Sequence, residues 1–214
     1  MPGDLEGLAR DFSGRIQRVL NTTLCTGIKM STLVSADRKV VNVGYGLSKT
    51  QVTTLPIPVR RGTRRPRCWL DVQYRLKLDE EATYLMVHSS FFGLYGDAET
   101  AMCLCHFDYE RNKSDGYPEA HLQVDGESAA LAGWTGSPRT KELGRLHFPA
   151  GNRRYRTILE DVIEFMIVER LADPCEGWEQ VIARERQEFQ RLQLRAAIRR
   201  DPETAREMVR ELDV

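Results

Sequence analysis

The pattern of apolar and polar positions predicts a helical start, a β-rich middle and a helical end. Residues 4–20 carry apolar side chains at helical spacing behind a possible N-cap at Asp4, which predicts a helix of about four turns. Residues 28–59 are rich in Val, Thr and Ile and are interrupted by Gly and Pro, which predicts three short strands. Because Pro56 and Pro58 lack the amide donor that a central strand needs, the third strand is expected at an edge.

The clearest strand lies in residues 68–78, where apolar and polar residues alternate strictly. A period of two predicts one set of side chains in the core and the other set in solvent. The set expected in the core is Leu70, Val72, Tyr74 and Leu76, and the set expected in solvent is Asp71, Gln73 and Arg75. Residues 83–89, 101–109 and 120–124 alternate in the same way, which indicates an antiparallel meander.

The period changes to that of a helix in the last third of the chain. Residues 158–172, 178–196 and 202–212 each carry an apolar stripe at helical spacing, and an Asp-Pro start signal precedes the second and the third. The middle stripe continues for more than five turns, so it must be buried, either on its own domain or on a partner. In the second case Trp178 and Phe189 would be the anchors of a protein partner or of self-association.

These elements predict an α+β fold. It consists of an N-terminal helix, an antiparallel β-meander of about six to eight strands, and a C-terminal set of about three helices. We expect a single domain over residues 1–214, in which residues 1–150 supply the first helix and the β-rich part and residues 151–214 the helical part. A helix should cover one face of the sheet, because alternating apolar positions must be buried against something.

The overall composition is typical of an ordinary globular protein, with 41% hydrophobic and 29% charged residues. The 31 basic and 31 acidic side chains cancel, which excludes a global electrostatic attraction to nucleic acid or to an anionic membrane. Five cysteines at irregular spacing, without a CxxC pair, indicate free thiols in a reducing compartment. The sequence shows no signal-peptide pattern and no apolar run near the ~20 residues of a membrane span, so a cytoplasmic protein without membrane contact is expected.

Basic residues are nevertheless concentrated in two places, each next to an aromatic residue. The first group is Arg60, Arg61, Arg64, Arg65 and Arg67, and the second is Arg153, Arg154 and Arg156. Arginine beside an aromatic ring suits phosphate contact combined with base stacking, so both groups are candidates for contact with RNA or DNA. The alternative is that both are solvated loops, or that the second group pairs with acids of the helix that follows it.

A second candidate site comes from two neighbouring strands. His106 and Asp108 lie two residues apart and share a strand face, and His121 lies on the next strand. A base, an orienting acid and a nearby cation are what a metal-independent endoribonuclease needs. The spacing fits a metal site less well, and the residues could equally be polar positions on a solvated face. Phosphate-loop and nucleophile-elbow motifs do not occur, and we expect no cofactor.

Two resemblances bear on the setting. The stretches RLHFPAGNRRYRTILEDVIEFMIVE (145–169) and GWEQVIARERQEFQRLQLRAAIRRDPETAREMVREL (177–212) resemble an uncharacterised family of bacterial proteins. The stretch LCHFDYERNKSDGYPEAHLQV (104–124) is similar to the TumE toxins of toxin–antitoxin systems, which are small α+β proteins. These resemblances imply a bacterial protein in a defence or toxin–antitoxin setting.

The functional hypothesis is therefore a cytosolic bacterial binding module that acts through protein or nucleic-acid contact. The alternative is the endoribonuclease toxin that would use His106, Asp108 and His121.

Overall fold

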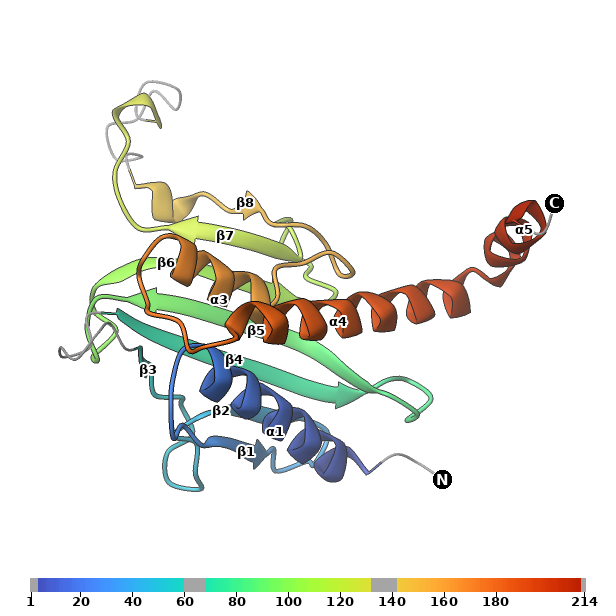
Figure 1. Cartoon of the computed structure of the whole chain (residues 1–214), viewed down its shortest axis with the longest axis horizontal. Coiled ribbons are helices and arrows are strands. Elements are labelled where there is room, and N and C mark those ends of the chain that lie inside the picture. The colour runs from blue at the N-terminus through green and yellow to red at the C-terminus, as the bar shows by residue number, and fades with distance from the viewer. Residues whose placement is uncertain (1–3, 60–67, 132–141, 213–214) are drawn as a thin grey trace.

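The computed structural model describes residues 4–59, 68–131 and 142–212. Within these residues the strands are β1 (Met30–Val34), β2 (Val41–Tyr45), β3 (Ile57–Val59), β4 (Cys68–Leu78), β5 (Leu85–Tyr95), β6 (Cys103–Glu110), β7 (Ala120–Val124) and β8 (Phe148–Pro149). They form one antiparallel sheet in the order β1-β2-β4-β5-β6-β7-β8, and β3 pairs with β4. The predicted meander is confirmed (Figure 1).

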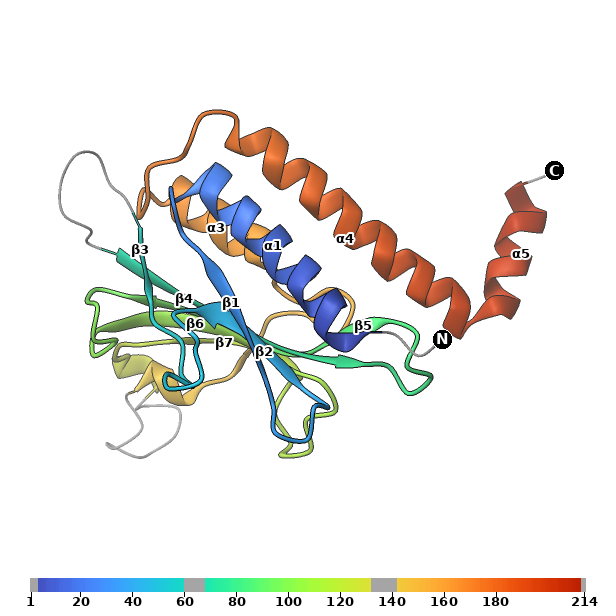
Figure 2. The same ribbon diagram turned by 90° about the horizontal axis from the view of Figure 1, so that it is seen from below.

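Four α-helices accompany the sheet in the described residues. They are α1 (Leu5–Thr23), α3 (Leu159–Val168), α4 (Trp178–Arg200) and α5 (Pro202–Leu212), and a short 3-10 helix, η1 (Leu143–Arg145), precedes β8. Figure 2 shows α1, α3 and α4 on the same face of the sheet, whereas α5 projects beyond it. The predicted N-terminal helix and C-terminal set of three helices are confirmed.

The core lies between the sheet and the helices. Its buried residues include Ile16 and Leu20 of α1, Val43, Leu70, Val72 and Leu76 of the sheet, Leu159, Val162 and Ile163 of α3, and Ile182 of α4. The ring of Tyr74 lies edge-on to Phe12 at 4.9 Å and to Phe92 at 5.5 Å, which ties α1 to the sheet. Each large apolar side chain buried here contributes roughly 1.5–3 kcal/mol. The apolar half of the predicted alternation is confirmed.

The polar half of that alternation is partly wrong. Arg75 is exposed, but Gln73 is half-buried and Asp71 is only 6% exposed. The segment between β2 and β3 crosses this face, because a Cβ on Gly44 would lie 2.1 Å from the Thr54 methyl group. Asp71 accepts hydrogen bonds from Gln73 and Thr54, and burial raises the pKa of its carboxyl group. A loop thus replaces solvent on this part of the face.

The helix predicted over residues 158–172 ends earlier, at Val168. Arg170 adopts a left-handed conformation with φ of 59°, and the amide groups of Leu171 and Ala172 both donate to the Met166 carbonyl. Such a left-handed residue satisfies the last carbonyls of a helix and turns the chain. The chain then returns to begin α4 on the same side of the sheet (Figure 2).

The apolar stripe of α4 is buried only at its beginning. Trp178 packs against the core and Ile182 is 2% exposed, whereas Leu192 is 44% and Ile198 is 46% exposed. The expectation that the stripe is buried on its own domain therefore holds for the first half of α4, whereas in the second half Phe189 and Ala196 are half-buried and Leu192 is exposed. None of the helices in the described part of the chain is long and apolar enough to cross a membrane.

Candidate functional site

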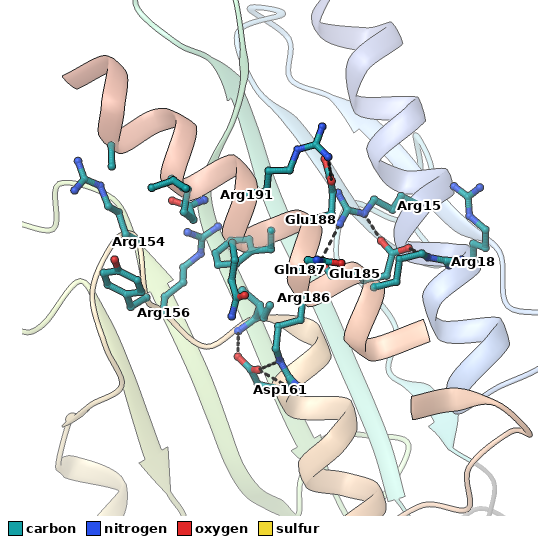
Figure 3. A pocket seen from close by; sticks show the side chains of 18 residues that line it. Arg15, Arg18, Arg154, Arg156, Asp161, Glu185, Arg186, Gln187, Glu188 and Arg191 are labelled. Atoms are coloured by element: carbon teal, nitrogen blue, oxygen red, sulfur yellow. Dashed lines mark hydrogen bonds and ion pairs between the residues drawn. The ribbon is translucent and has the colours of Figure 1, made fainter. Parts of the chain in front are cut away.

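An open cleft with a volume of about 1180 Å³ runs along α4. Figure 3 shows Arg154 and Arg156 on one side of this helix and Arg15 and Arg18 on the other. The charged lining residues are the arginines Arg15, Arg18, Arg154, Arg156, Arg184, Arg186 and Arg191 and the acids Asp161, Glu185 and Glu188. Seven cations against three carboxylates make this cleft basic in a protein whose net charge is zero.

The turn before α3 is shaped to present arginine and tyrosine to the cleft. Gly151 has a φ of 92°, and a Cβ there would lie 2.0 Å from the Tyr155 carbonyl oxygen, so only glycine fits. The Asn152 side chain accepts a hydrogen bond from the Arg154 amide at 3.0 Å. This turn leaves Tyr155 77% exposed at the rim of the cleft.

The carboxylates of the cleft are already engaged by particular arginines. Arg15 binds Glu185 with 2.6 Å between Nε and Oε2. Arg186 binds Asp161 at 2.9 Å and also Glu164, at 2.6 Å. Arg18, Arg154 and Arg156 make no ion pair among the described residues. These three guanidinium groups therefore keep their capacity to bind an anion.

Arg156 differs from Arg18 and Arg154 in the surroundings of its guanidinium group. Its guanidinium lies 4.4 Å from the ring centroid of Tyr109 and 5.3 Å from that of Phe189, and it donates to the Arg153 carbonyl at 2.7 Å. Burial lowers the pKa of Arg156, although an arginine remains protonated at neutral pH. Two aromatic faces stabilise this cation, and the buried carboxylate of Glu160 attracts it, but among the described residues no carboxylate forms an ion pair with it. Arg156 is therefore a candidate to bind an anionic group in the cleft.

Arg153 has a different position from Arg154 and Arg156. It binds Glu119 at 2.6 Å and donates to the Asn112 side chain at 2.5 Å, and its hydrogen bond lowers the pKa of the Glu119 carboxyl group. It joins the loop between β6 and β7 to the turn before α3 and does not line the cleft. Next to it, burial lowers the pKa of Arg111, whose Nε has no hydrogen-bond partner among the described residues.

The other residues predicted to contact nucleic acid or a partner differ in where they lie. The group from Arg60 to Arg67 lies outside the described residues. Trp178 is half-buried and packs against the core of its own chain. Phe189 is half-buried and faces Arg156 in the cleft. The pairing considered between the second arginine group and the acids of α3 does not form, because Arg186 of α4 takes Asp161 and Glu164.

The histidine site lies on the opposite face of the sheet. Asp108 and His121 are direct neighbours in the pairing of β6 and β7, with 4.0 Å between Oδ2 and Nε2. His121 is 2% exposed and its Nδ1 lies 3.2 Å from the Pro118 carbonyl oxygen. Burial lowers the pKa of His121, so the neutral imidazole is favoured. His106 does not join them, since its Nε2 lies 2.9 Å from the Gln123 side chain.

The sequence reasoning missed one member of this cluster, His147. Its ring lies 4.6 Å from that of His121, and Tyr117 stacks on its other side at 3.8 Å between centroids. The short pairing of β8 with β7 brings it there, and no spacing in the sequence signals that contact. Among the described residues, no group of three or more His, Cys, Asp or Glu side chains is placed to hold a metal ion.

Comparisons with protein-family models, with curated proteins and with solved structures give no match for this chain. The molecule carries two candidate sites, one on each face of the sheet. The basic cleft combines volume, uncompensated charge and aromatic rings, whereas the histidine cluster has its central His121 buried and is accessible through Asp108, Tyr117 and part of His147.

Proposed function

We propose that this protein is a binding module that holds single-stranded nucleic acid in the basic cleft along α4. The observation that carries the proposal is the set of three arginines, Arg18, Arg154 and Arg156, that line one cleft without carboxylate partners. Guanidinium groups bind phosphate through two parallel hydrogen bonds, and these three arginines come from two separate segments, α1 and the turn before α3.

The shape of the cleft favours a polymer over a small ligand. Its volume of about 1180 Å³ exceeds the usual ~300–1,000 Å³ of a small-molecule pocket, and its lining residues lie on both sides of α4 (Figure 3). Tyr155 at the rim and Phe189 inside supply ring faces on which bases could stack. Because the net charge of the protein is zero, attraction would be local to the cleft and the salt dependence would report only a few phosphate contacts.

The test is binding of fluorescently labelled single-stranded RNA and DNA, followed by anisotropy over a range of salt concentrations. We expect Arg18→Gln and Arg154→Gln each to weaken binding, and each to reduce the slope of log K against log salt by about 0.7. The matched control is Arg75→Gln, an exposed arginine on the opposite face, which should bind as the unchanged protein does. Absence of binding at low salt, or equal binding by all four proteins, would contradict the proposal.

We also propose that this binding module acts in a bacterial defence or toxin–antitoxin system. Its support is the resemblance of residues 104–124, which form β6, β7 and the loop between them. This loop is held by Glu119 to Arg153 and so borders the turn that presents Arg154 and Arg156. In such a setting a cytoplasmic RNA would be the natural ligand of the cleft.

The second candidate function is a metal-independent endoribonuclease on the opposite face. It is favoured by the approach of Asp108 to His121 at 4.0 Å and by the addition of His147 to this pair. If it is correct, the protein should fragment total RNA in the presence of a metal chelator, and Asp108→Asn should abolish the fragmentation. The Asp108 side chain is 34% exposed, so this near-isosteric change should leave the fold intact. Intact RNA after incubation with the unchanged protein would eliminate this candidate and leave the binding module untouched.

A further inference from the structure

The last helix, α5, carries an apolar stripe that nothing in the described chain covers. The stripe consists of Ala205, Met208, Val209 and Leu212, which recur at helical spacing. Met208 is 49%, Val209 is 56% and Leu212 is 78% exposed, and α5 has no buried residue. An amphipathic helix gains most of its stability from burial of such a stripe, so α5 lacks the packing surface that would stabilise it.

The junction with α4 holds α5 away from the rest of its own chain. Asp201 ends α4, and its side chain accepts a hydrogen bond from the Thr204 amide at 3.1 Å, which caps α5. Pro202 occupies the first position of α5, where its fixed φ suits the helix. Figures 1 and 2 both show α5 pointing away from the sheet and from the other helices. The apolar stripe of α5 is therefore exposed to solvent.

The second half of α4 offers a surface of matching character. Leu194 and Ile198 are 61% and 46% exposed and lie one turn apart, and Leu194 also lines the end of the basic cleft. Beside them α4 carries an arginine ladder, Arg191, Arg195 and Arg199, and α5 carries a glutamate ladder, Glu203, Glu207 and Glu211. Both ladders have a spacing of four residues, so each follows one side of its helix.

Most of these charges have no counter-ion within the chain. Among the described residues, no ion pair involves Arg195 or any member of the glutamate ladder. Arg191 approaches Glu188 only at 4.0 Å, and Arg199 lies over the ring of Tyr84. Opposite charges that flank apolar stripes are the arrangement by which two helices select each other.

We infer that the occupant of this surface is a second copy of the chain, with α5 of each copy docked on the second half of α4 of the other. The two surfaces are complementary in charge and both belong to the same chain, so a two-fold pair satisfies both at once. A foreign partner would need to match an acidic helix and a basic helix separately. This inference goes beyond the proposed function: Arg191 and Leu194 also line the cleft, but the charges changed in the experiment, Arg195 and Glu207, do not.

The experiment exchanges the central charge of each ladder and measures mass by size-exclusion chromatography with light scattering. The unchanged protein should be a dimer, and Arg195→Glu and Glu207→Arg should each weaken the dimer by at least about 10-fold. The double variant should recover the dimer. An equimolar mixture of the two single variants should also form a dimer, because each α5 then meets an opposite charge on the other chain.

Two controls keep the result interpretable. Glu169→Arg, an exposed charge reversal at the end of α3, should leave the dimer unchanged. The circular dichroism melting curves of all variants should coincide under dissociating dilution, because Arg195 and Glu207 lack partners in the single chain. A protein that is monomeric at about 100 µM, or dimers that persist in both single variants, would overturn the inference. A monomer that associates only with a different protein would overturn it as well.

Discussion

Arg156 and Arg186 line the same cleft but differ in their partners, so one is expected to act in binding and the other in stability. It is partly buried between the rings of Tyr109 and Phe189 and has no carboxylate partner. Arg186, on the same cleft, is bound by both Asp161 and Glu164. A paired arginine stabilises the fold through its carboxylates, whereas an unpaired, desolvated one costs free energy that a bound anion would recover.

We therefore expect opposite outcomes when each arginine is replaced by methionine, which keeps most of the length of the side chain. Arg156→Met should change the free energy of unfolding by less than about 1 kcal/mol, because relief of desolvation offsets the lost aromatic contacts. The same variant should weaken binding of single-stranded RNA. Arg186→Met should lower the free energy of unfolding by about 1 kcal/mol, since two carboxylates lose their cation. Urea denaturation together with anisotropy distinguishes the two, and a large loss of stability in Arg156→Met would make that residue structural.

Residue roles of this kind were only partly accessible from the sequence. The arginine cluster before α3 was predicted as a candidate site. The sequence did not show that Arg153 has a different role from Arg154 and Arg156, because Arg153 forms an ion pair with Glu119, 34 positions away along the chain. His147 was missed for the same reason, as its contact with His121 depends on the pairing of β8. Local pattern identifies chemistry-bearing residues, whereas their partners are set by tertiary pairing.

At the scale of elements, helices and strands followed from periodicity, and the errors fell where another segment intervenes. The period of two correctly placed Leu70, Val72 and Leu76 in the core, because those positions face α1 and α3. It failed for Asp71, because the segment that carries Thr54 covers the opposite face. The stripe of α4 was recognised along its whole length, yet no sequence pattern reveals where a helix leaves the surface of its domain.

The two halves of the C-terminal helical region should contribute very differently to stability. Ile182 is buried to 2% exposure against the core, so Ile182→Ala should lower the free energy of unfolding by about 3 kcal/mol. Removal of α5 after Asp201 should change it by less than about 0.5 kcal/mol, since α5 has no buried residue. Urea denaturation of both variants at a dilution that keeps the chain monomeric provides the measurement. A substantial loss on removal of α5 would mean that this helix packs on its own chain.

At the scale of the whole molecule, charge is balanced in total but separated in space. The net charge is zero, yet the protein has a basic cleft along α4 and an acidic ladder on α5. Composition therefore excluded only a global attraction to nucleic acid, and it could not exclude a local one. The two faces of the sheet also differ, since α1, α3 and α4 gather on one face (Figure 2) and leave the histidine cluster on the other.

The position of the last buried side chain in α4 gives the molecule a mechanical property. Ile182 fixes the helix near its first turn, and 18 further residues extend from that point to Arg200, a length of about 27 Å at 1.5 Å per residue. Beyond Ile182 the described residues hold the helix through individual side-chain contacts, which include Glu185 with Arg15, Arg186 with Asp161, and Arg199 over the ring of Tyr84 near its far end. The basic cleft lies between Ile182 and that end, so a load applied at α5 would reach Arg156 through these side-chain contacts and not through a packed apolar core.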